Sequence, residues 1–248
     1  MTRPVAIVTG AGSGIGAAIA KRLSDRYDLI ISHLNDDADL QDVLTTVEQR
    51  GAAAVAVLGD LTDPATIDTL AREVQESTDR LEVLVSNAGA YPRIAWNALD
   101  LDSFREQIEI NLVTHAACAK LVTPALTARL YGRIVAVSSV LTQLGRVDLA
   151  AYIAAKSGLE GLVRALAREL GPYDVTVNCV RAGSIEVPAE HAVVADHEAM
   201  VTRQLDRQCV QRRGQPDDVA AAADFLASHD AGFITGQCLT VDGGWCLT

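Results

Sequence analysis

Short apolar runs alternate along this chain with longer segments in which apolar residues recur every three or four positions. Some of the runs, such as Val5–Thr9, are almost continuously apolar, which is typical of parallel strands that helices cover on both faces. In the segment 150–170, Leu159, Leu162 and Val163 belong to an apolar stripe at helical spacing. This alternation predicts right-handed βαβ crossovers and a doubly wound parallel sheet.

The pattern places seven strands and six helical segments. The predicted strands are Val5–Thr9, Leu29–His33, Ala54–Leu58, Val83–Ser86, Arg133–Ser138, Val175–Val180 and Gln237–Val241. The predicted helices lie near residues 15–25, 37–50, 64–78, 101–129, 150–170 and 217–227. We therefore expect an α/β fold of the Rossmann type, a doubly wound parallel seven-stranded sheet with helices on both faces, in one domain over residues 1–248.

One stretch, Gly183–Gly214, breaks this rhythm. It is long, mixed in charge and helical only in part, most clearly over His191–Gln208. Because long insertions between core strands commonly form binding loops, we expect a substrate lid at about 184–214.

Charge and composition narrow the functions that such a fold can have. Lys and Arg number 21 against 32 Asp and Glu, which gives a formal net charge of −11. An acidic surface disfavours nucleic acid and anionic membranes as partners. We see neither an apolar run long enough to span a membrane nor the pattern of a signal peptide, and we expect a cytoplasmic protein.

The cysteines and histidines do not indicate a metal site. Cys118, Cys179, Cys209, Cys238 and Cys246 are widely spread and form no CxxC pair, and the histidines show no HExxH spacing. We interpret the cysteines as reduced thiols, mostly buried, and expect no bound metal.

A glycine-rich segment, Thr9–Gly16, joins the first predicted strand to the first predicted helix and reads TGAGSGIG. Glycines allow a tight turn and a close approach of backbone N–H groups to a pyrophosphate, and a helix N-terminus adds partial positive charge. The spacing is GxxxGxG rather than the usual GxGxxG, and no Gly-Lys-Ser/Thr follows, so the segment is not a Walker loop. It predicts dinucleotide binding.

Eight motifs in order make the chain similar to the single-domain branch of the short-chain dehydrogenase/reductase family, and most of all to 3-oxoacyl-acyl-carrier-protein reductases. The motifs are TGxxxGxG at Thr9–Gly16, D-L-T-D at 60–63, the NAG turn at 87–89, Asn111, the set of Ser139 with Tyr152 and Lys156 in YxxxK, GxPxDVA at 214–220, ITGQ at 234–237 and VDGG at 241–244. The resemblance covers nearly the whole chain and implies an NAD(P)-dependent oxidoreductase.

Tyr152 and Lys156 stand four residues apart, which puts both on one face of a helix. A nearby ammonium is expected to lower the pKa of the phenol toward the range of a catalytic acid. The resemblance implies that Lys156 also holds the nicotinamide ribose, that Ser139 stabilises the substrate oxygen, and that Asn111 anchors a proton-relay water. Ser139, rather than its neighbour Ser138, lies thirteen residues before Tyr152, the spacing common in the family.

The resemblance also implies a set of cofactor contacts. Asp60 is expected to accept from the adenine amino group, beside the backbone of Leu61, and the NAG turn to line the ribose and nicotinamide. The full expected set is Gly10, Ser13, Gly14, Ile15, Gly16, Ser32, His33, Asn35, Asp60, Leu61, Asn87, Ala88, Gly89, Tyr152, Lys156, Gly183 and Ile185.

The end of the second strand bears on the choice of cofactor. NAD enzymes use a carboxylate there to bind the ribose diol, and His33 occupies that position here. Ser32, His33 and Asn35 could donate to a 2′-phosphate, so the sequence favours NADP(H). NAD(H) stays open, because Ser13 stands where NADP enzymes often carry a basic residue and two aspartates, Asp36 and Asp37, follow closely.

Two departures from the family pattern lie beside the expected substrate position. Arg181 and Ala182 stand where the family usually has a small residue followed by proline, and Val187 replaces a threonine that often binds the nicotinamide carboxamide. Both departures affect the assignment of the substrate more than that of the reaction type. Backbone groups of Ile185 are the expected alternative anchor for the carboxamide.

The leading hypothesis is an NADPH-dependent reductase of a ketone or a 3-oxoacyl thioester. An NAD-dependent alcohol, polyol or steroid dehydrogenase and a non-catalytic nucleotide-binding regulator are the alternatives. Arg129 is a candidate contact for an acyl carrier protein, although Pro172–Asp174 lacks the second basic residue often found there. Loop residues suggest a mostly apolar pocket, whose candidates are Tyr91, Trp96, Leu141, Leu144 and Val147. The resemblance also implies a homotetramer built through 101–129 and 150–170.

Overall fold

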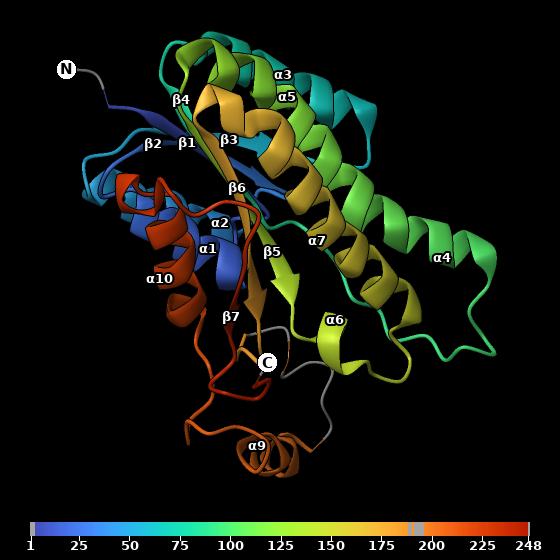
Figure 1. The fold of residues 1–248 in the computed structure, drawn as a ribbon. Coiled ribbons are helices and arrows are strands. Elements are labelled where there is room, and N and C mark those ends of the chain that lie inside the picture. Colours follow the sequence, from blue (N-terminus) through green and yellow to red (C-terminus); the bar gives the residue numbers. More distant parts are fainter. Residues whose placement is uncertain (1–2, 188–189, 191–195, 248) are drawn as a thin grey trace.

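The computed structural model describes residues 3–187, 190 and 196–247, and its centre is one seven-stranded sheet (Figure 1). The strands are β1 (Val5–Thr9), β2 (Asp28–His33), β3 (Ala54–Leu58), β4 (Leu81–Ser86), β5 (Gly132–Ser139), β6 (Val175–Ala182) and β7 (Cys238–Val241). They run parallel in the order β3-β2-β1-β4-β5-β6-β7. The predicted sheet is confirmed, with each strand within two residues of its expected ends.

Helices cover both faces of this sheet. The helices of the described residues are α1 (Gly14–Leu23), α2 (Ala38–Gln49), α3 (Pro64–Glu76), α4 (Leu101–Ile108), α5 (Thr114–Arg129), α6 (Leu141–Leu144), α7 (Ala150–Leu170), α9 (His197–Leu205) and α10 (Pro216–Leu226). In Figure 1, α1, α2 and α10 pack on one face and α3, α4, α5 and α7 on the other. This is the doubly wound arrangement that the alternating pattern predicted.

The two hydrophobic cores follow from the pleat of the strands. In β1, Ala6 and Val8 join the core under α1 and α10, whereas Val5 and Ile7 join the core under α5 and α7. Successive side chains of a strand point to opposite faces, so a strand buried on both faces must be apolar at every position. This explains the continuous apolar runs in the sequence.

The order of the strands fixes where a ligand can bind. From β1 the chain winds outward through β2 to β3, and then returns to β4 on the other side of β1. At such a switch point, the crevice outside the carboxyl ends of the strands is the usual ligand site.

The predicted helix over 101–129 is interrupted. Between α4 and α5, residues Glu109–Val113 form one π-helical turn that contains Asn111. Single π-helical turns are frequent at functional sites, because the extra residue re-aims a side chain. The short helix α6 was not predicted.

The predicted lid lies partly outside the described residues. Its expected helical part, His191–Gln208, is a helix over His197–Leu205, while 188–189 and 191–195 are not described. Figure 1 shows α9 apart from the sheet, beyond its carboxyl edge.

Two polar side chains, Asn178 of β6 and Asp218 of α10, have structural roles. The Asn178 side chain donates to Ile234 O at 2.8 Å and accepts from Gln237 N at 3.0 Å, which fixes the entry into β7. Asp218 closes a capping box with Gln215 at the start of α10. None of the described helices is long and apolar enough to cross a membrane.

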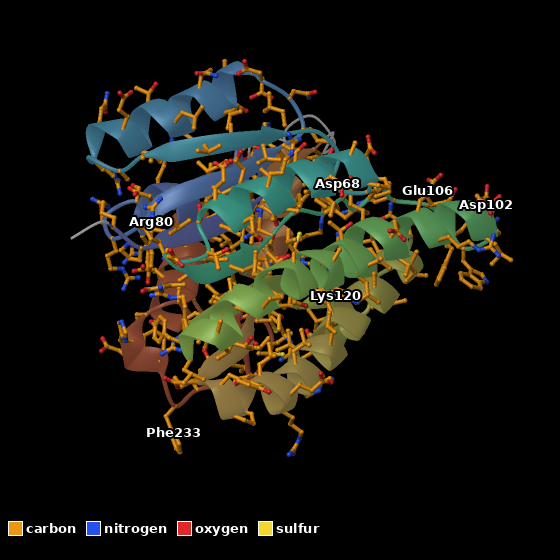
Figure 2. All side chains as sticks on the ribbon, turned by 90° about the horizontal axis from the view of Figure 1, so that it is seen from above. Asp68, Arg80, Asp102, Glu106, Lys120 and Phe233 are labelled. Carbon is orange, nitrogen blue, oxygen red and sulfur yellow. The ribbon has the colours of Figure 1, made fainter. Side chains whose placement is uncertain are left out.

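Charged side chains point away from the molecule on several helices. Figure 2 labels Asp102 and Glu106 on α4 and Lys120 on α5 among these outward side chains. Phe233, which projects from the loop before β7, is the most exposed large apolar side chain of the described residues.

Candidate active site

A cavity of about 1020 Å³ opens at the carboxyl ends of the strands. It runs from the glycine-rich segment, past the end of β2, to Tyr152 and Lys156 on α7, and all but one of the predicted site residues line it. The lining includes Gly10, Ser13, Gly14, Ile15, Gly16, Ser32, His33, Asp60, Leu61, Asn87, Ala88, Gly89, Asn111, Ser139, Tyr152, Lys156, Gly183 and Ile185. Asn35 is exposed and does not line the cavity.

The glycine-rich segment is too tight for side chains. A Cβ on Gly16 would lie 2.1 Å from Gly10 O, and Gly10 and Gly14 have φ of 63° and 54°. Ser13 caps α1 without a side-chain hydrogen bond, so its hydroxyl and the first N–H groups of the helix are available to a ligand. An exposed helix N-terminus beside a backbone cradle is a fitting site for a pyrophosphate.

Thr9 fastens this segment to the NAG turn. Its hydroxyl accepts from Asn87 N at 2.9 Å and from Ala88 N at 3.0 Å, and the Asn87 amide donates to Thr9 O and Gly10 O, each at 3.1 Å. Two motifs that are far apart in the sequence therefore form one rigid wall of the cavity.

The end of β2 forms one side of the cavity. The His33 ring packs over Gly12, where a Cβ would lie 2.5 Å from it, and His33 Nε2 is 3.1 Å from Asp37 Oδ2. The Ser32 hydroxyl accepts from Gly10 N at 3.4 Å. No carboxylate stands at the position of His33, as the sequence indicated.

Asn111 is held by its π-helical turn and by the loop after β4. Its amide donates to Ala90 O at 2.8 Å and to Gln107 Oε1 at 3.1 Å, and the side chain is fully buried. A Cβ on Gly89 would lie 2.7 Å from Asn111 Oδ1 and 3.5 Å from Lys156 Nζ. Gly89 thus allows these two side chains to approach each other.

Tyr152 behaves differently from the sequence-based expectation. Burial raises the pKa of its phenol to about 12, and an interaction with the Ser139 side chain opposes this only in part. The expected lowering by the Lys156 ammonium is wrong in this structure, because Lys156 Nζ lies 6.0 Å from the Tyr152 ring centre and turns to other partners. Desolvation of the phenolate outweighs the attraction that we expected.

Lys156 is buried among neutral acceptors. Its Nζ donates to Val137 O at 2.9 Å and lies 3.3 Å from His115 Nε2. Burial lowers the pKa of Lys156 to about 7. This ammonium therefore exchanges its proton near neutral pH, far below the usual range of a lysine.

His115 is a site residue that the sequence analysis missed. It lies on α5, one turn after Asn111, and its Nδ1 is 2.7 Å from the Ser86 hydroxyl. Burial, together with the Lys156 ammonium, lowers its pKa well below the usual value, so the imidazole is neutral. The four-residue spacing from Asn111 was the signal in the sequence, because it places both side chains on one helix face.

Comparisons with known proteins agree with this geometry. A family model described as enoyl-(acyl carrier protein) reductase matches residues 10–246. The chain is 37% identical over 243 residues to cis-4-hydroxycyclohexanecarboxylate dehydrogenase of Sinomonas cyclohexanicum, covering 97% of this chain and 96% of the relative. It is 33% identical over 240 residues to a 3-oxoacyl-acyl-carrier-protein reductase of Salmonella typhimurium, with the same coverage. The chain belongs to the short-chain dehydrogenase/reductase family.

A solved member of this family shows the same fold. Acetoin dehydrogenase from Salmonella typhimurium superimposes with a TM-score of 0.87 at 29% identity, covering 98% of this chain and 96% of that one. The protein is accordingly an oxidoreductase of the short-chain dehydrogenase/reductase family, whose members use NAD(P)(H).

The unusual Arg181 has a partner that explains it. Its guanidinium makes two bonds to the Glu160 carboxylate, at 2.8 and 2.7 Å, and Ser138 and Thr142 donate to the same carboxylate at 2.9 Å each. The Ser138 hydroxyl is therefore occupied, which leaves Ser139 beside Tyr152. Among the described residues, the Glu160 oxygen and the sulfurs of Cys179 and Cys238 lie within 4.8 Å of one another, but Glu160 is already committed to Arg181.

The predicted apolar pocket is only partly correct. Tyr91 and Leu141 line the cavity, but Trp96, Leu144 and Val147 are 74%, 43% and 77% exposed and do not. These loop residues were assigned from sequence proximity, which does not fix the direction of a side chain. Val187 lines the cavity instead, with its Cγ1 3.3 Å from where a Gly14 Cβ would be.

Proposed function

We propose that the protein transfers a hydride between NADP(H) and a carbonyl compound or secondary alcohol, as a reductase of a ketone or a 3-oxoacyl thioester. The observation that carries this proposal is the single cavity shared by the glycine-rich segment, Ser139, Tyr152 and Lys156. Acid–base groups and a dinucleotide cradle in one cavity are what hydride transfer to a carbonyl requires.

The residues present fit a dinucleotide. The glycine-rich segment with the N-terminus of α1 would hold the pyrophosphate, and Asp60 with Leu61 the adenine. The NAG turn, Gly183 and Ile185 would line the nicotinamide side. When bound, the nicotinamide supplies or accepts the hydride.

The chain's own groups supply the proton. The Tyr152 phenol, with its raised pKa, stays protonated at neutral pH and would donate to the carbonyl oxygen during reduction. Ser139 would donate a hydrogen bond to the same oxygen. Lys156 would hold the ribose hydroxyls and return a proton to Tyr152, and Asn111 would anchor the water that connects Lys156 to solvent.

NADP(H) is the proposed cofactor because no carboxylate lies at the end of β2. His33 faces the cavity there, beside the Ser32 hydroxyl. A 2′-phosphate would meet donors at this position, whereas an NAD-type carboxylate would repel it. An NAD-dependent alcohol, polyol or steroid dehydrogenase is the second candidate, favoured by Asp37 and by Asp39, which also lines the cavity.

A free small molecule is a better proposal than an acyl carrier protein. The carrier-protein candidate Arg129 is already paired with Glu82 at 3.0 Å and with Asp79 O. A relative at 33% identity is named for a carrier-protein substrate and one at 37% for a free hydroxy acid. The engaged guanidinium favours the free molecule.

Three further proposals concern the whole molecule. The segment 184–214 acts as a substrate lid, since Val187, Met200 and Gln204 line the cavity from it. The chain forms a homotetramer through the outer faces of α4, α5 and α7, where Leu101 is 69% exposed. A monomeric mass measured by light scattering would overturn this proposal. A cytoplasmic location agrees with five cysteines that are all unpaired.

The test is turnover of a panel of ketones and 3-oxoacyl thioesters with NADPH and NADH, in the wild type and in Tyr152→Phe. Loss of the phenol should reduce kcat by roughly 10²–10⁴-fold, the usual contribution of a positioned acid. Tyr91→Phe is the matched control, because its ring centre lies 6.1 Å from that of Tyr152 in the same cavity. Full turnover by Tyr152→Phe would refute the proposed chemistry.

A further inference from the structure

Four arginines line the cavity: Arg203 lies on α9, and the other three come from the connections between elements. Arg93 comes from the loop between β4 and α4, Arg146 from the loop between α6 and α7, and Arg207 from the segment just after α9. The first two loops are tied together, because Ile94 N donates to Asp148 O at 2.9 Å. We call Arg93, Arg146 and Arg207 the arginine wall.

The arginine wall has no counter-ion within the described part of the chain. No ion pair or side-chain hydrogen bond engages these three guanidinium groups there, whereas Arg212 and Arg213, a few residues further on, pair with Asp218 and Glu190 at 2.7 Å each. The chain has an excess of acidic residues and a net charge of −11, yet these three arginines form no ion pair with a described residue. Three cations from separate segments, none of them in an ion pair with an acid of the described residues, indicate a ligand of opposite charge.

The other carboxylates of the cavity do not neutralise this wall. Glu190 binds Arg213, and Asp196 caps α9 by accepting from Ala199 N at 3.0 Å. Asp39 lies on α2 and Asp60 follows β3, so both come from the part of the fold next to the end of β2. Asp148, near Arg146 in sequence, lines a separate small hollow.

The wall is electrostatically strained. Partial burial, and then repulsion from Arg93 and Arg207, lower the pKa of Arg146. Like charges brought together without a counter-ion disfavour one another, and an anion bound between them would relieve that repulsion. The planar guanidinium fork suits the paired oxygens of a carboxylate or phosphoryl group.

We propose that the arginine wall binds an anionic group of the substrate, so that the enzyme acts on oxo or hydroxy compounds that carry a carboxylate or phosphoryl group away from the reacting carbon. This inference rests on the oxidoreductase function proposed above. It adds the substrate class and three specificity residues, which select by charge while Tyr152 and Ser139 act on the reacting oxygen.

The first experiment compares substrates of equal shape and different charge. Turnover of levulinate and of its neutral amide, levulinamide, is measured for the wild type, Arg146→Gln and Arg207→Gln. Acetoacetyl-CoA is the third substrate, and it carries phosphoryl groups in place of the carboxylate. We expect KM for levulinate to rise in each variant by roughly 10- to 100-fold, the scale of a lost charge-assisted hydrogen bond, with little change for levulinamide. Arg168→Gln, at the end of α7 and outside the cavity, is the matched control.

The second experiment measures binding without turnover. Calorimetric titration with cyclohexanecarboxylate, which has no carbonyl to reduce, should show binding that Arg146→Gln weakens at least tenfold and Arg168→Gln preserves. The neutral cyclohexanecarboxamide should bind weakly to all three proteins. Since no hydride moves, this readout is independent of the proposed reaction.

The outcomes separate the two proposals. Equal binding of acid and amide, unchanged in Arg146→Gln, would overturn the anionic substrate class even if neutral ketones were reduced. Charge-dependent binding together with full turnover by Tyr152→Phe would leave the wall standing and overturn the catalytic assignment. An Arg146 effect confined to acetoacetyl-CoA would support the wall, with phosphoryl oxygens as its ligands.

Discussion

The Nε2 atom of His115 lies 3.3 Å from the Nζ atom of Lys156, and both side chains are buried. A neutral imidazole that accepts the ammonium proton at Nε2 carries its own proton on Nδ1, which can then donate to the Ser86 hydroxyl 2.7 Å away. His115 is therefore a positioning residue, because it orients Lys156 through a hydrogen bond.

Replacing His115 should shift a pH profile. An acceptor stabilises the charged lysine, so His115→Leu should lower the pKa of Lys156 further and move the alkaline limb of kcat to lower pH. His115→Gln, which retains an acceptor, should restore much of the profile. The measurement is kcat against pH for the three proteins. Identical alkaline limbs would show that His115 only fills space.

Lys156 should make folding stability depend on pH. Its pKa is lowered from 10.5 to about 7 in the folded protein, so between these values the unfolded chain binds more protons and stability rises with pH. Tyr152 acts oppositely above about pH 10, because its pKa is raised to about 12 and the unfolded chain loses that proton first.

Lys156→Met therefore tests the burial of this charge. The variant should have a higher Tm than the wild type below pH 7, and the difference should shrink as pH approaches 10. Thermal unfolding at several pH values measures it. Lys120→Met, on the exposed side of α5 (Figure 2), is the control and should leave the pH dependence unchanged. A constant difference across this range would contradict the prediction.

Gly89 should tolerate no side chain. The Cβ of Gly89→Ala would lie 2.7 Å from Asn111 Oδ1, so it should displace Asn111 and lower kcat more than tenfold, with a stability loss of about 1–3 kcal/mol. Gly161→Ala on α7, where a Cβ meets nothing within 4 Å, is the control and should gain about 0.5–1 kcal/mol. Activity assays and urea unfolding measure both. Normal turnover by Gly89→Ala would show that Asn111 need not stay in place.

His33→Asp should move the cofactor preference toward NADH. The carboxylate would repel a 2′-phosphate and accept from a ribose diol, so kcat/KM for NADPH should fall at least tenfold and that for NADH should rise. Asn35→Asp, outside the cavity lining, should have a smaller effect. A wild type that turns over NADH ten times faster than NADPH would end the NADP(H) proposal.

The lid proposal predicts a change in hydrogen exchange. Backbone amides of 196–214 should gain protection when NADPH and a ketone are added together, because a lid that closes orders its backbone. Amides of β1 and β4, in the sheet core, serve as the internal reference. Unchanged exchange in the segment would rule out closure.

The fold could be predicted almost completely because strand and helix periodicities differ. A strand such as β3 shows its bounds in the sequence, since an apolar run ends at Leu58 before Gly59. The turn at Glu109–Val113 could not be predicted, because a π-helical turn keeps the composition of a helix and differs only in its hydrogen bonds.

The pairing of Tyr152 with Lys156 was predictable for the same local reason, and the arginine wall was not. Tyr152 and Lys156 are one turn apart on a single helix, whereas Arg93, Arg146 and Arg207 meet only through the path of three loops. The direction of the Tyr152 pKa was also missed. Spacing shows that a lysine is near, but not how much water the phenol loses.

The arginine wall belongs to connections between elements, while the glycine-rich segment and α7 belong to the frame of the sheet. Substitutions in those connections can alter which compounds bind without displacing the glycine-rich segment or α7. A change of substrate specificity thus requires only a few replacements in three exposed connections. Laboratory evolution of new specificities should therefore randomise positions in these connections.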